Sequence, residues 1–181
     1  KVVSFVHQSN ILGTINPVAL IAARARAVGA LIVLDACQSV GQMTVDVNQI
    51  GCDLLTGTGR KFLREPSGTG FLYIRSSVLE KLDPPFIDFH AASWTAENTF
   101  VLAEGARRFE SGETSNAGKI GMIEAVRYAS RIGIGRIEQR VQALAETLRN
   151  RLREIGGVVV HDQGERKCGI VTFSKAGVTP D

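Results

Sequence analysis

The sequence is poor in the residues that build metal centres and disulfide frameworks. It has three cysteines and three histidines among 181 residues. Cys37, Cys52 and Cys168 are widely spaced and form neither a CxxC pair nor a zinc pattern. We therefore predict no metal site, and we expect three buried thiols in a protein of the reducing cytoplasm.

Long hydrophobic runs and an excess of charge of one sign are also missing. No apolar run approaches the roughly 20 residues that a membrane helix needs, and no signal peptide is visible. Lysine and arginine number 21 against 18 acidic residues, so the net charge is only +3. This small charge, without a block of like charges, does not favour nucleic acid as a partner. The 44% of apolar residues suffices for a globular core.

The stretch "LLTGTGRKFLREPSGTGFLYI" (54–74) places one lysine, Lys61, between two glycine-rich turns. A phosphate-binding loop would need Ser or Thr after this lysine, but Phe62 follows it. No G-x-G-x-x-G segment argues for a dinucleotide. Arg60, Lys61 and Arg64 form one local basic cluster, which is too little for a nucleic-acid surface. A third reading is that the Lys61 amine forms an imine with a cofactor aldehyde.

Apolar segments alternate with a helical segment in the first part of the chain. The residue types predict strands over 2–6, 30–36, 52–58 and 68–75. Asn16-Pro17 and Gly29 mark the ends of a helix over 17–29. Unbroken apolar strands indicate a mixed, mostly parallel sheet that helices cover on both faces. We therefore expect an α/β fold with a three-layer α/β/α large domain.

The second part of the chain reads differently. Residues 80–116 are less regular, and the stretch 81–94, which holds two prolines and several aromatics, is expected to be a loop. A helix over 119–133 and a long helix over 134–157 follow, and strands are expected over 158–162 and 169–174. The long helix carries an apolar stripe at Ile134, Ile137, Val141, Leu144, Leu148, Leu152 and Ile155, which we expect to be packed.

These elements suggest a division into domains. Residues 1–133 are expected to form part of a cofactor-binding large domain. The long helix, taken as 134–156, would connect it to the start of a small C-terminal α+β domain at 157–181. Because the chain begins inside a buried-type strand, we expect it to be a fragment of a longer protein.

Polar side chains gather where the predicted strands end. They are Asn10 after the first strand, Asp35 and Gln38 after the second, and Thr58, Arg60 and Lys61 after the third. Ligands of open α/β sheets bind at this edge. A pyridoxal phosphate enzyme needs an amine, a carboxylate for the ring nitrogen, donors for the phosphate and a polar partner for the ring hydroxyl. All four are present, and the neighbouring Arg60 cation favours a neutral Lys61 amine.

Four segments carry a resemblance to a known family. "HQSNILGTINPV", "LIVLDACQSVGQMTVDV", "CDLLTGTGRKFLREPSGTGFLYIR" and "RRFESGETSNAGKIGMIEAVRYA" resemble the class V aminotransferase family. This group of fold type I pyridoxal phosphate enzymes includes cysteine desulfurases and related carbon–sulfur lyases. The resemblance covers almost the whole chain, and the order and spacing of Asn10, Asp35, Gln38 and Lys61 make it specific.

The resemblance implies a role for each matching residue. Lys61 would be the catalytic lysine that binds the cofactor aldehyde. The cofactor contacts would be Asp35 at the pyridine nitrogen, Gln38 at the ring hydroxyl, Asn10 near that hydroxyl or the substrate carboxylate, and Thr58 and Arg60 at the phosphate. In "RRFESGET" (107–114), a region that approaches the phosphate of a partner subunit in the family, Thr114 would supply a hydroxyl. A homodimer is therefore also implied.

The sequence departs from the family pattern immediately before the lysine. The commoner Ser-Gly-His-Lys is Thr-Gly-Arg-Lys here, so arginine at position 60 adds a fixed charge suited to phosphate. This change argues against a standard housekeeping desulfurase and for the lyase or epimerase-like branches. The resemblance implies an enzyme acting on an amino acid, most closely a cysteine desulfurase or carbon–sulfur lyase. A class V aminotransferase, an epimerase-like enzyme or a non-catalytic domain that keeps the fold are the alternatives.

Overall fold

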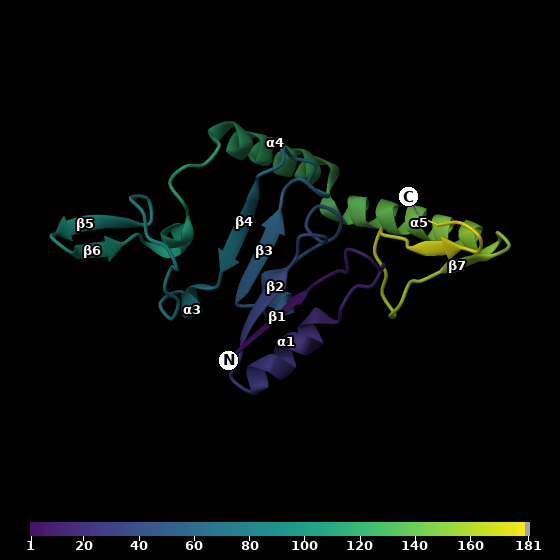
Figure 1. Ribbon diagram of the computed structural model, residues 1–181, viewed down its shortest axis with the longest axis horizontal. Helices are drawn as coiled ribbons and strands as arrows, with labels where there is room; N and C mark the ends of the chain where they lie inside the picture. The colour runs from purple at the N-terminus through teal and green to yellow at the C-terminus, as the bar shows by residue number, and fades with distance from the viewer. Residues whose placement is uncertain (180–181) are drawn as a thin grey trace.

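The unbroken apolar segments form one sheet at the centre of the molecule (Figure 1). The computed structural model describes residues 1–179. The sheet has four strands in the order β1 (Val2–Val6), β2 (Leu31–Asp35), β3 (Leu54–Thr58) and β4 (Gly70–Ile74). The first three are parallel and β4 runs antiparallel to β3. The predicted α/β fold with a mixed, mostly parallel sheet is confirmed.

The three longer helices, α1 (Val18–Ala27), α4 (Asn116–Ile132) and α5 (Ile134–Arg153), lie where the sequence pattern predicts them. The part of the chain that the structure describes adds three short helices, α2 (Val47–Ile50), α3 (Ser76–Leu79) and η1 (Gly105–Phe109, a 3-10 helix). Gly133 separates α4 from α5 at φ 93°, a conformation that glycine adopts without steric cost. Within residues 1–179, no helix combines the length and the apolar character needed to cross a membrane.

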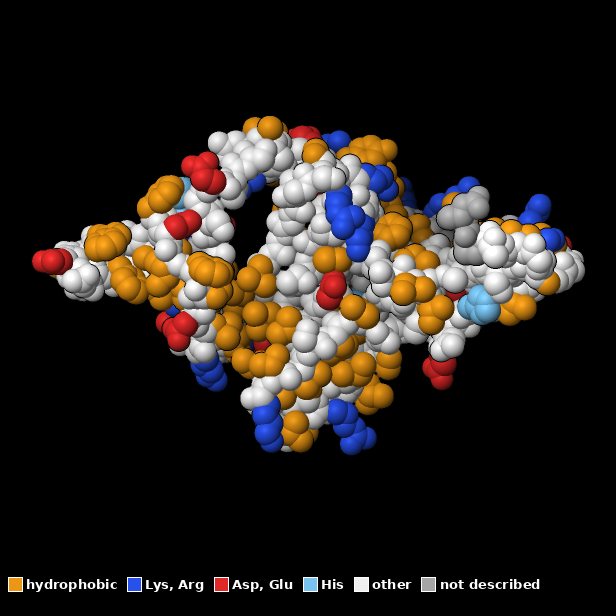
Figure 2. Space-filling model, viewed as in Figure 1, with side chains coloured by type: hydrophobic (Ala, Val, Ile, Leu, Met, Phe, Trp, Pro, Cys, Tyr) orange, Lys and Arg blue, Asp and Glu red, His pale blue; other side chains and the backbone are white. Residues whose placement is uncertain are grey.

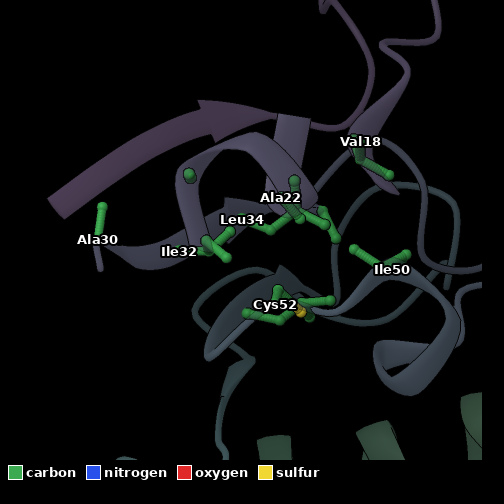
Figure 3. Close-up of a cluster of buried hydrophobic side chains, with 10 residues drawn as sticks. Val18, Ala22, Ala30, Ile32, Leu34, Ile50 and Cys52 are labelled. Atoms are coloured by element: carbon green, nitrogen blue, oxygen red, sulfur yellow. The ribbon is translucent and has the colours of Figure 1, made fainter. Parts of the chain in front are cut away.

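The main core lies between α1 and the sheet (Figure 3). Ala22 of α1 and Ile32 and Leu34 of β2 are almost completely buried. Burying a side chain such as leucine or isoleucine contributes about 1.5–3 kcal/mol to stability. This packing fixes β2, and through the β2–β3 pairing it fixes β3, so the two strand ends that carry Asp35 and Thr58 start from a rigid base.

The predicted loop over 81–94 is wrong at its last three residues, 92–94, where a hairpin begins. β5 (Ala92–Ala96) pairs with β6 (Thr99–Leu102) in antiparallel register. Asn98 turns the chain at φ 56°, a conformation to which asparagine is well suited. The hairpin buries almost none of its side chains, and Trp94 is 77% exposed. A hairpin without a buried face leaves no clear alternation of apolar and polar residues to detect.

A second small hairpin follows α5. β7 (Val158–Val160) pairs antiparallel with β8 (Phe173–Lys175). The predicted strand over 169–174 therefore begins later in the structure. The Arg149 guanidinium donates hydrogen bonds to the carbonyl oxygens of Cys168 and Ile170, so these carbonyl groups do not pair in a strand ladder.

The packed face of α5 differs from the predicted stripe. Leu144 and Leu148 are 52% and 46% exposed, whereas Ala145, Arg149 and Leu152 are buried. The buried face includes an arginine, which a search for apolar spacing does not include. The expected packing of the whole apolar stripe is therefore wrong for Leu144, Leu148 and the terminal Ile155, which are all exposed.

Candidate active site

The carboxyl ends of β1, β2 and β3 meet at one edge of the sheet. Asp35, the last residue of β2, pairs with Val6 of β1 and with Thr56 of β3. The pairing continues beyond the strands, because His7 N donates to Asp35 O at 2.8 Å and Ala36 N to Thr56 O at 2.9 Å. The common strand edge expected from the sequence is therefore present.

Asp35 and Lys61 both act on the thiol of Cys37. Burial raises the pKa of this thiol, and the Asp35 carboxylate raises it further through a hydrogen bond and its charge. The Lys61 charge and the Thr58 backbone N–H oppose the rise. Asp35 Oδ1 also accepts a hydrogen bond from Cys37 N at 2.8 Å. Cys37 therefore lies next to the Asp35 carboxylate, and the pKa of its thiol responds to the charges of both Asp35 and Lys61.

The turn after β2 lies directly against the loop that carries Lys61. Gly41 has φ 93°, and a Cβ atom at this position would lie 2.5 Å from Phe62 C and 2.6 Å from Leu63 N. A real Cβ atom does not come this close to backbone, so only glycine allows the two segments to touch. This contact fixes the distance between the end of β2 and the Lys61 loop.

The Lys61 loop is held by its own hydrogen bonds. Gly59 N donates to Thr69 O at 3.0 Å, and Glu65 N donates to Gly59 O at 3.1 Å. The Thr69 hydroxyl donates to the buried Glu65 carboxylate at 2.5 Å. The absent side chain of Gly59 leaves the space that this carboxylate fills. Lys61 therefore projects from a loop with an ordered backbone, which suits a residue that must meet a ligand atom at a fixed place.

The other candidate residues lie at the same edge with fewer contacts. Gln38 is half-buried in the turn after β2, and its backbone oxygen accepts a hydrogen bond from Gln42 Nε2 at 2.5 Å. The Thr58 hydroxyl donates to Thr69 O at 3.3 Å. Asn10 lies exposed in the loop after β1, and Arg60 is exposed next to Lys61. None of the hydrogen bonds among residues 1–179 connects Asn10 with the Asp35–Lys61 group.

Thr114 is exposed in the segment that precedes α4. The next residue, Ser115, caps the helix by accepting a hydrogen bond from Gly118 N at 3.0 Å. A Cβ atom at Gly118 would lie 3.1 Å from Thr69 Cγ2, so the start of α4 packs on the end of the Lys61 loop. This places the Thr114 segment beside the loop, while no contact in the described part of the chain joins its side chain to Lys61.

Sequence reasoning missed two groups at this edge. Cys37 is expected from the sequence to be only a buried thiol, yet it is half-buried and its backbone N–H bonds to Asp35 Oδ1. Gln8 and Gln42 are buried and joined by a hydrogen bond of 2.8 Å from Gln42 Nε2 to Gln8 Oε1. The position of Cys37, two residues after a strand-end acid, was the available signal for the first group. No local pattern identifies the second.

The donor set at the edge fits pyridoxal phosphate. None of the ion pairs among residues 1–179 includes Asp35, Arg60 or Lys61, so these three charges remain available to a ligand. A carboxylate, an amine and a guanidinium match the ring nitrogen, the aldehyde and the phosphate of this cofactor. Cavities of about 570 and 390 Å³ lie elsewhere, between α1, α5 and the 165–167 segment, and their linings include neither Asp35 nor Lys61.

The chain is similar to curated proteins over nearly its full length. It is 35% identical over 180 residues to a protein named probable cysteine desulfurase from Methanothermobacter thermautotrophicus, covering 99% of this chain and 45% of the relative. It is 34% identical over 168 residues to the cysteine desulfurase of Yersinia pseudotuberculosis, covering 92% of this chain and 41% of the relative. The chain thus spans less than half the length of these relatives.

Solved structures show the same fold. The apo structure of the cysteine desulfurase from Thermococcus onnurineus superposes with a TM-score of 0.92 at 34% identity, over 99% of this chain and 45% of the other. The cystine C-S lyase C-DES, solved in complex with cysteine persulfide, gives a TM-score of 0.88 at 24% identity, over 97% and 48%. The family model described as aminotransferase class-V matches residues 1–181. The chain therefore belongs to the class V aminotransferase family of pyridoxal phosphate-dependent enzymes.

Proposed function

We propose that the full-length protein is a pyridoxal phosphate-dependent enzyme that cleaves the carbon–sulfur bond of cysteine or a related amino acid. The observation that carries this proposal is that the turn after Asp35 packs at Gly41 against the loop that carries Lys61, beside the ends of the neighbouring parallel strands β2 and β3. Relatives named cysteine desulfurase support the sulfur-containing substrate. They also weaken the idea that arginine before Lys61 indicates a different branch of the family.

Each proposed role follows from the chemistry of the side chain. The bound cofactor would supply an electron-accepting ring at the substrate. Lys61 Nζ would bind the cofactor aldehyde and then move a proton at the substrate Cα. Asp35 would hold the ring nitrogen in its protonated form. Both residues would act from rigid positions, because β2 and the turn at Gly41 fix them relative to each other.

The remaining contacts are proposed for the polar ends of the cofactor. Thr58 and Arg60 would hold the phosphate, for which the arginine fork is well suited. Gln38 would contact the ring hydroxyl, and Asn10 this hydroxyl or the substrate carboxylate. Thr114 would reach the phosphate of a partner subunit. The exposure of Arg60, Asn10 and Thr114 is compatible with these roles, because each side chain is available to a ligand.

We also propose the division into domains that the sequence suggests. The central sheet within residues 1–133 would bind the cofactor, and the helix over 134–156 would connect it to a small domain that starts at 157–181. The break at Gly133 and the packing of β7 on α5 support this division. The hairpin after α5 has its own strand pairing and no ladder with the central sheet.

A homodimer is part of the proposal. Apolar side chains gather on and around the β5–β6 hairpin, at the left of Figure 2. Phe86, Phe89 and Trp94 are 88%, 72% and 77% exposed. Exposed apolar patches of this kind commonly mark protein–protein interfaces. Contact with a second copy would cover the patch and would bring a partner's Thr114 segment to the cofactor.

The proposed location is the cytoplasm, and the proposed substrate is a small amino acid and not a nucleic acid. All three cysteines are unpaired, which is typical of proteins in a reducing compartment. The net charge of +3 gives little attraction for a polyanion.

The proposal is tested by the products that the full-length protein forms from cysteine in the presence of pyridoxal phosphate. A desulfurase forms alanine, a lyase forms pyruvate, and an aminotransferase moves the amino group to a keto acid. We expect alanine or pyruvate together with released sulfur. Lys61→Ala is expected to lower the rate by about 100-fold or more, the contribution typical of a positioned acid–base group.

Lys1→Ala is the matched control, because Lys1 is exposed before β1, at the sheet edge opposite to the strand ends that carry Asp35 and Thr58. It should keep the wild-type rate. Turnover that survives in Lys61→Ala would refute the assignment of the catalytic lysine. Cofactor binding without any product would favour a non-catalytic domain that keeps the fold.

A further inference from the structure

The loop after β1 is held by a segment more than a hundred residues away in the chain. We call residues 9–15 the β1 loop and residues 162–172 the clamp segment. Figure 1 shows the purple β1 loop reaching the yellow end of the chain. Five hydrogen bonds join the two segments; the β1 loop donates three of them and the clamp segment donates two. The β1 loop carries Asn10, one of the proposed cofactor contacts.

The hydrogen bonds reach Ile11 and residues 13–15 of the β1 loop. Gly13 N donates to Asp162 Oδ1 at 3.3 Å, and Cys168 N donates to Gly13 O at 2.7 Å. The hydroxyl of Thr14 donates to Gln163 O at 2.9 Å, Ile15 N donates to Arg166 O at 3.0 Å, and the hydroxyl of Thr172 donates to Ile11 O. Most of these bonds involve backbone atoms of the loop, so they fix its path.

A buried ion pair organises the clamp segment. Arg149 and Asp162 form a salt bridge in which the side chains are only 1% and 2% exposed. Arg149 Nη2 also donates to Cys168 O at 2.7 Å and to Ile170 O at 3.1 Å. A Cβ atom at Gly13 would lie 2.5 Å from Asp162 Oδ1 and 2.8 Å from Arg149 Nη2. The β1 loop therefore packs directly on this ion pair.

The clamp segment reaches a second cofactor contact through Gln42. Gly169 N donates to Gln42 Oε1 at 3.2 Å, and Gln42 Nε2 donates to Gln38 O at 2.5 Å. Gln42 is 2% exposed, so an unpaired amide here would carry a desolvation cost. One segment thus contacts both the loop that carries Asn10 and the turn that carries Gln38.

We propose that the clamp segment positions Asn10 and Gln38 at the cofactor, with Thr172, Asp162 and Gln42 as positioning residues. The inference rests on the proposed function, because it concerns the same cofactor site. Loss of one clamp contact should loosen the β1 loop and weaken cofactor binding, while the fold is kept. A purely structural role would change stability but not cofactor affinity.

The test compares the full-length wild type with Thr172→Val, which keeps the side-chain shape and removes the hydroxyl bound to Ile11 O. Hydrogen exchange measures the β1 loop in cofactor-free protein, and a spectral titration measures the dissociation constant of pyridoxal phosphate. We expect faster exchange in residues 10–15 and a dissociation constant about 3- to 10-fold higher, the range for one neutral hydrogen bond. Thr172→Ser keeps the hydroxyl and should restore both values.

Thr147→Val is the matched control, since its hydroxyl bonds only Ala143 O within α5. Thr14→Val removes a second clamp contact. It replaces Thr172→Val in the same measurements if Thr172→Val does not fold. The inference would be overturned if the dissociation constant were unchanged in Thr172→Val, or if it rose equally in Thr147→Val. The proposed function would stand in both cases. A wild type that binds no pyridoxal phosphate at Lys61 would overturn the proposed function, and the inference with it.

Discussion

At the scale of single residues, the Cys37 thiol reports on the two groups that the proposed chemistry requires. Its pKa lies above the ordinary value because of burial first and of Asp35 second, and Lys61 acts in the opposite direction. The thiol is therefore protonated at neutral pH and reacts slowly, since the thiolate is the nucleophile. The same thiol is accessible enough to be measured, because Cys37 is only half-buried whereas Cys52 and Cys168 are buried.

The first prediction concerns the alkylation of Cys37. Asp35→Asn removes the negative charge and should lower the thiol pKa, so alkylation becomes faster at pH 8. Lys61→Met removes the positive charge and should raise the pKa, so alkylation becomes slower. The measurement is the pH profile of iodoacetamide labelling at Cys37, followed by peptide mass spectrometry. Profiles that do not respond to either substitution would show that the two charges are far from the thiol.

At the scale of elements, the site depends on the contact between the turn after β2 and the Lys61 loop. Gly41 makes this contact possible, since its φ is 93° and its Cα faces the backbone of Phe62 and Leu63. Gly29 also has a positive φ, of 70°, but no atom lies within 4 Å of a Cβ built there. A comparison of alanine substitutions at the two glycines therefore separates the free-energy cost of a strained backbone conformation from the cost of steric overlap.

The second prediction compares alanine at these two glycines. Gly29→Ala should cost about 1–2 kcal/mol of unfolding free energy, the price of a left-handed conformation in a residue with Cβ. Gly41→Ala should cost clearly more, about 3 kcal/mol or above, because overlap with backbone is added. Urea unfolding of both variants provides the measurement. Equal losses would mean that the turn and the loop are not in contact.

The elements also show what local sequence can predict. The four strands of the sheet and the long helices are recognisable because their residues are apolar and uninterrupted or end in Pro and Gly. The β5–β6 hairpin was missed because it has no buried face. The last strand was predicted to start too early, at 169, because Arg149 donates hydrogen bonds to the carbonyl oxygens of Cys168 and Ile170. The first miss reflects the absence of a buried face and the second reflects a tertiary contact, and neither leaves a local pattern in the sequence.

At the scale of the whole molecule, the strand order brings Asp35 and Thr58 to one edge, and this was predictable from the ends of the apolar segments. The hydrogen-bond partners of the β1 loop could not be predicted from the sequence, because Gly13 and Thr14 bond to residues 149 positions further along the chain. The surroundings of His7 also come from distant parts of the chain. Its buried ring lines a cavity together with Arg166 and Glu138, and its Nδ1 has no hydrogen-bond partner among the described residues.

The third prediction concerns the pH dependence of stability. Burial, and secondly the Arg166 charge, lower the pKa of His7 to about 4. Between about pH 6.5 and 4 the unfolded chain binds a proton at His7 that the folded chain does not, so stability falls as the pH falls through this window. His7→Gln should lose less stability than the wild type between pH 7 and pH 5, as measured by urea midpoints.

His161→Gln is the control for this comparison, because His161 is exposed. All three proteins contain the same carboxylates, so the difference between slopes isolates His7. Parallel slopes for wild type and His7→Gln would contradict the buried neutral ring.

The central claim is that the Lys61 amine binds pyridoxal phosphate while Asp35 faces the ring nitrogen. The most direct measurement is borohydride reduction of the full-length protein loaded with the cofactor, followed by mass spectrometric mapping of the modified lysine. The account predicts one phosphopyridoxyl group on Lys61 and none in Lys61→Ala. A modification that maps to a different lysine, or that persists in Lys61→Ala, would contradict it.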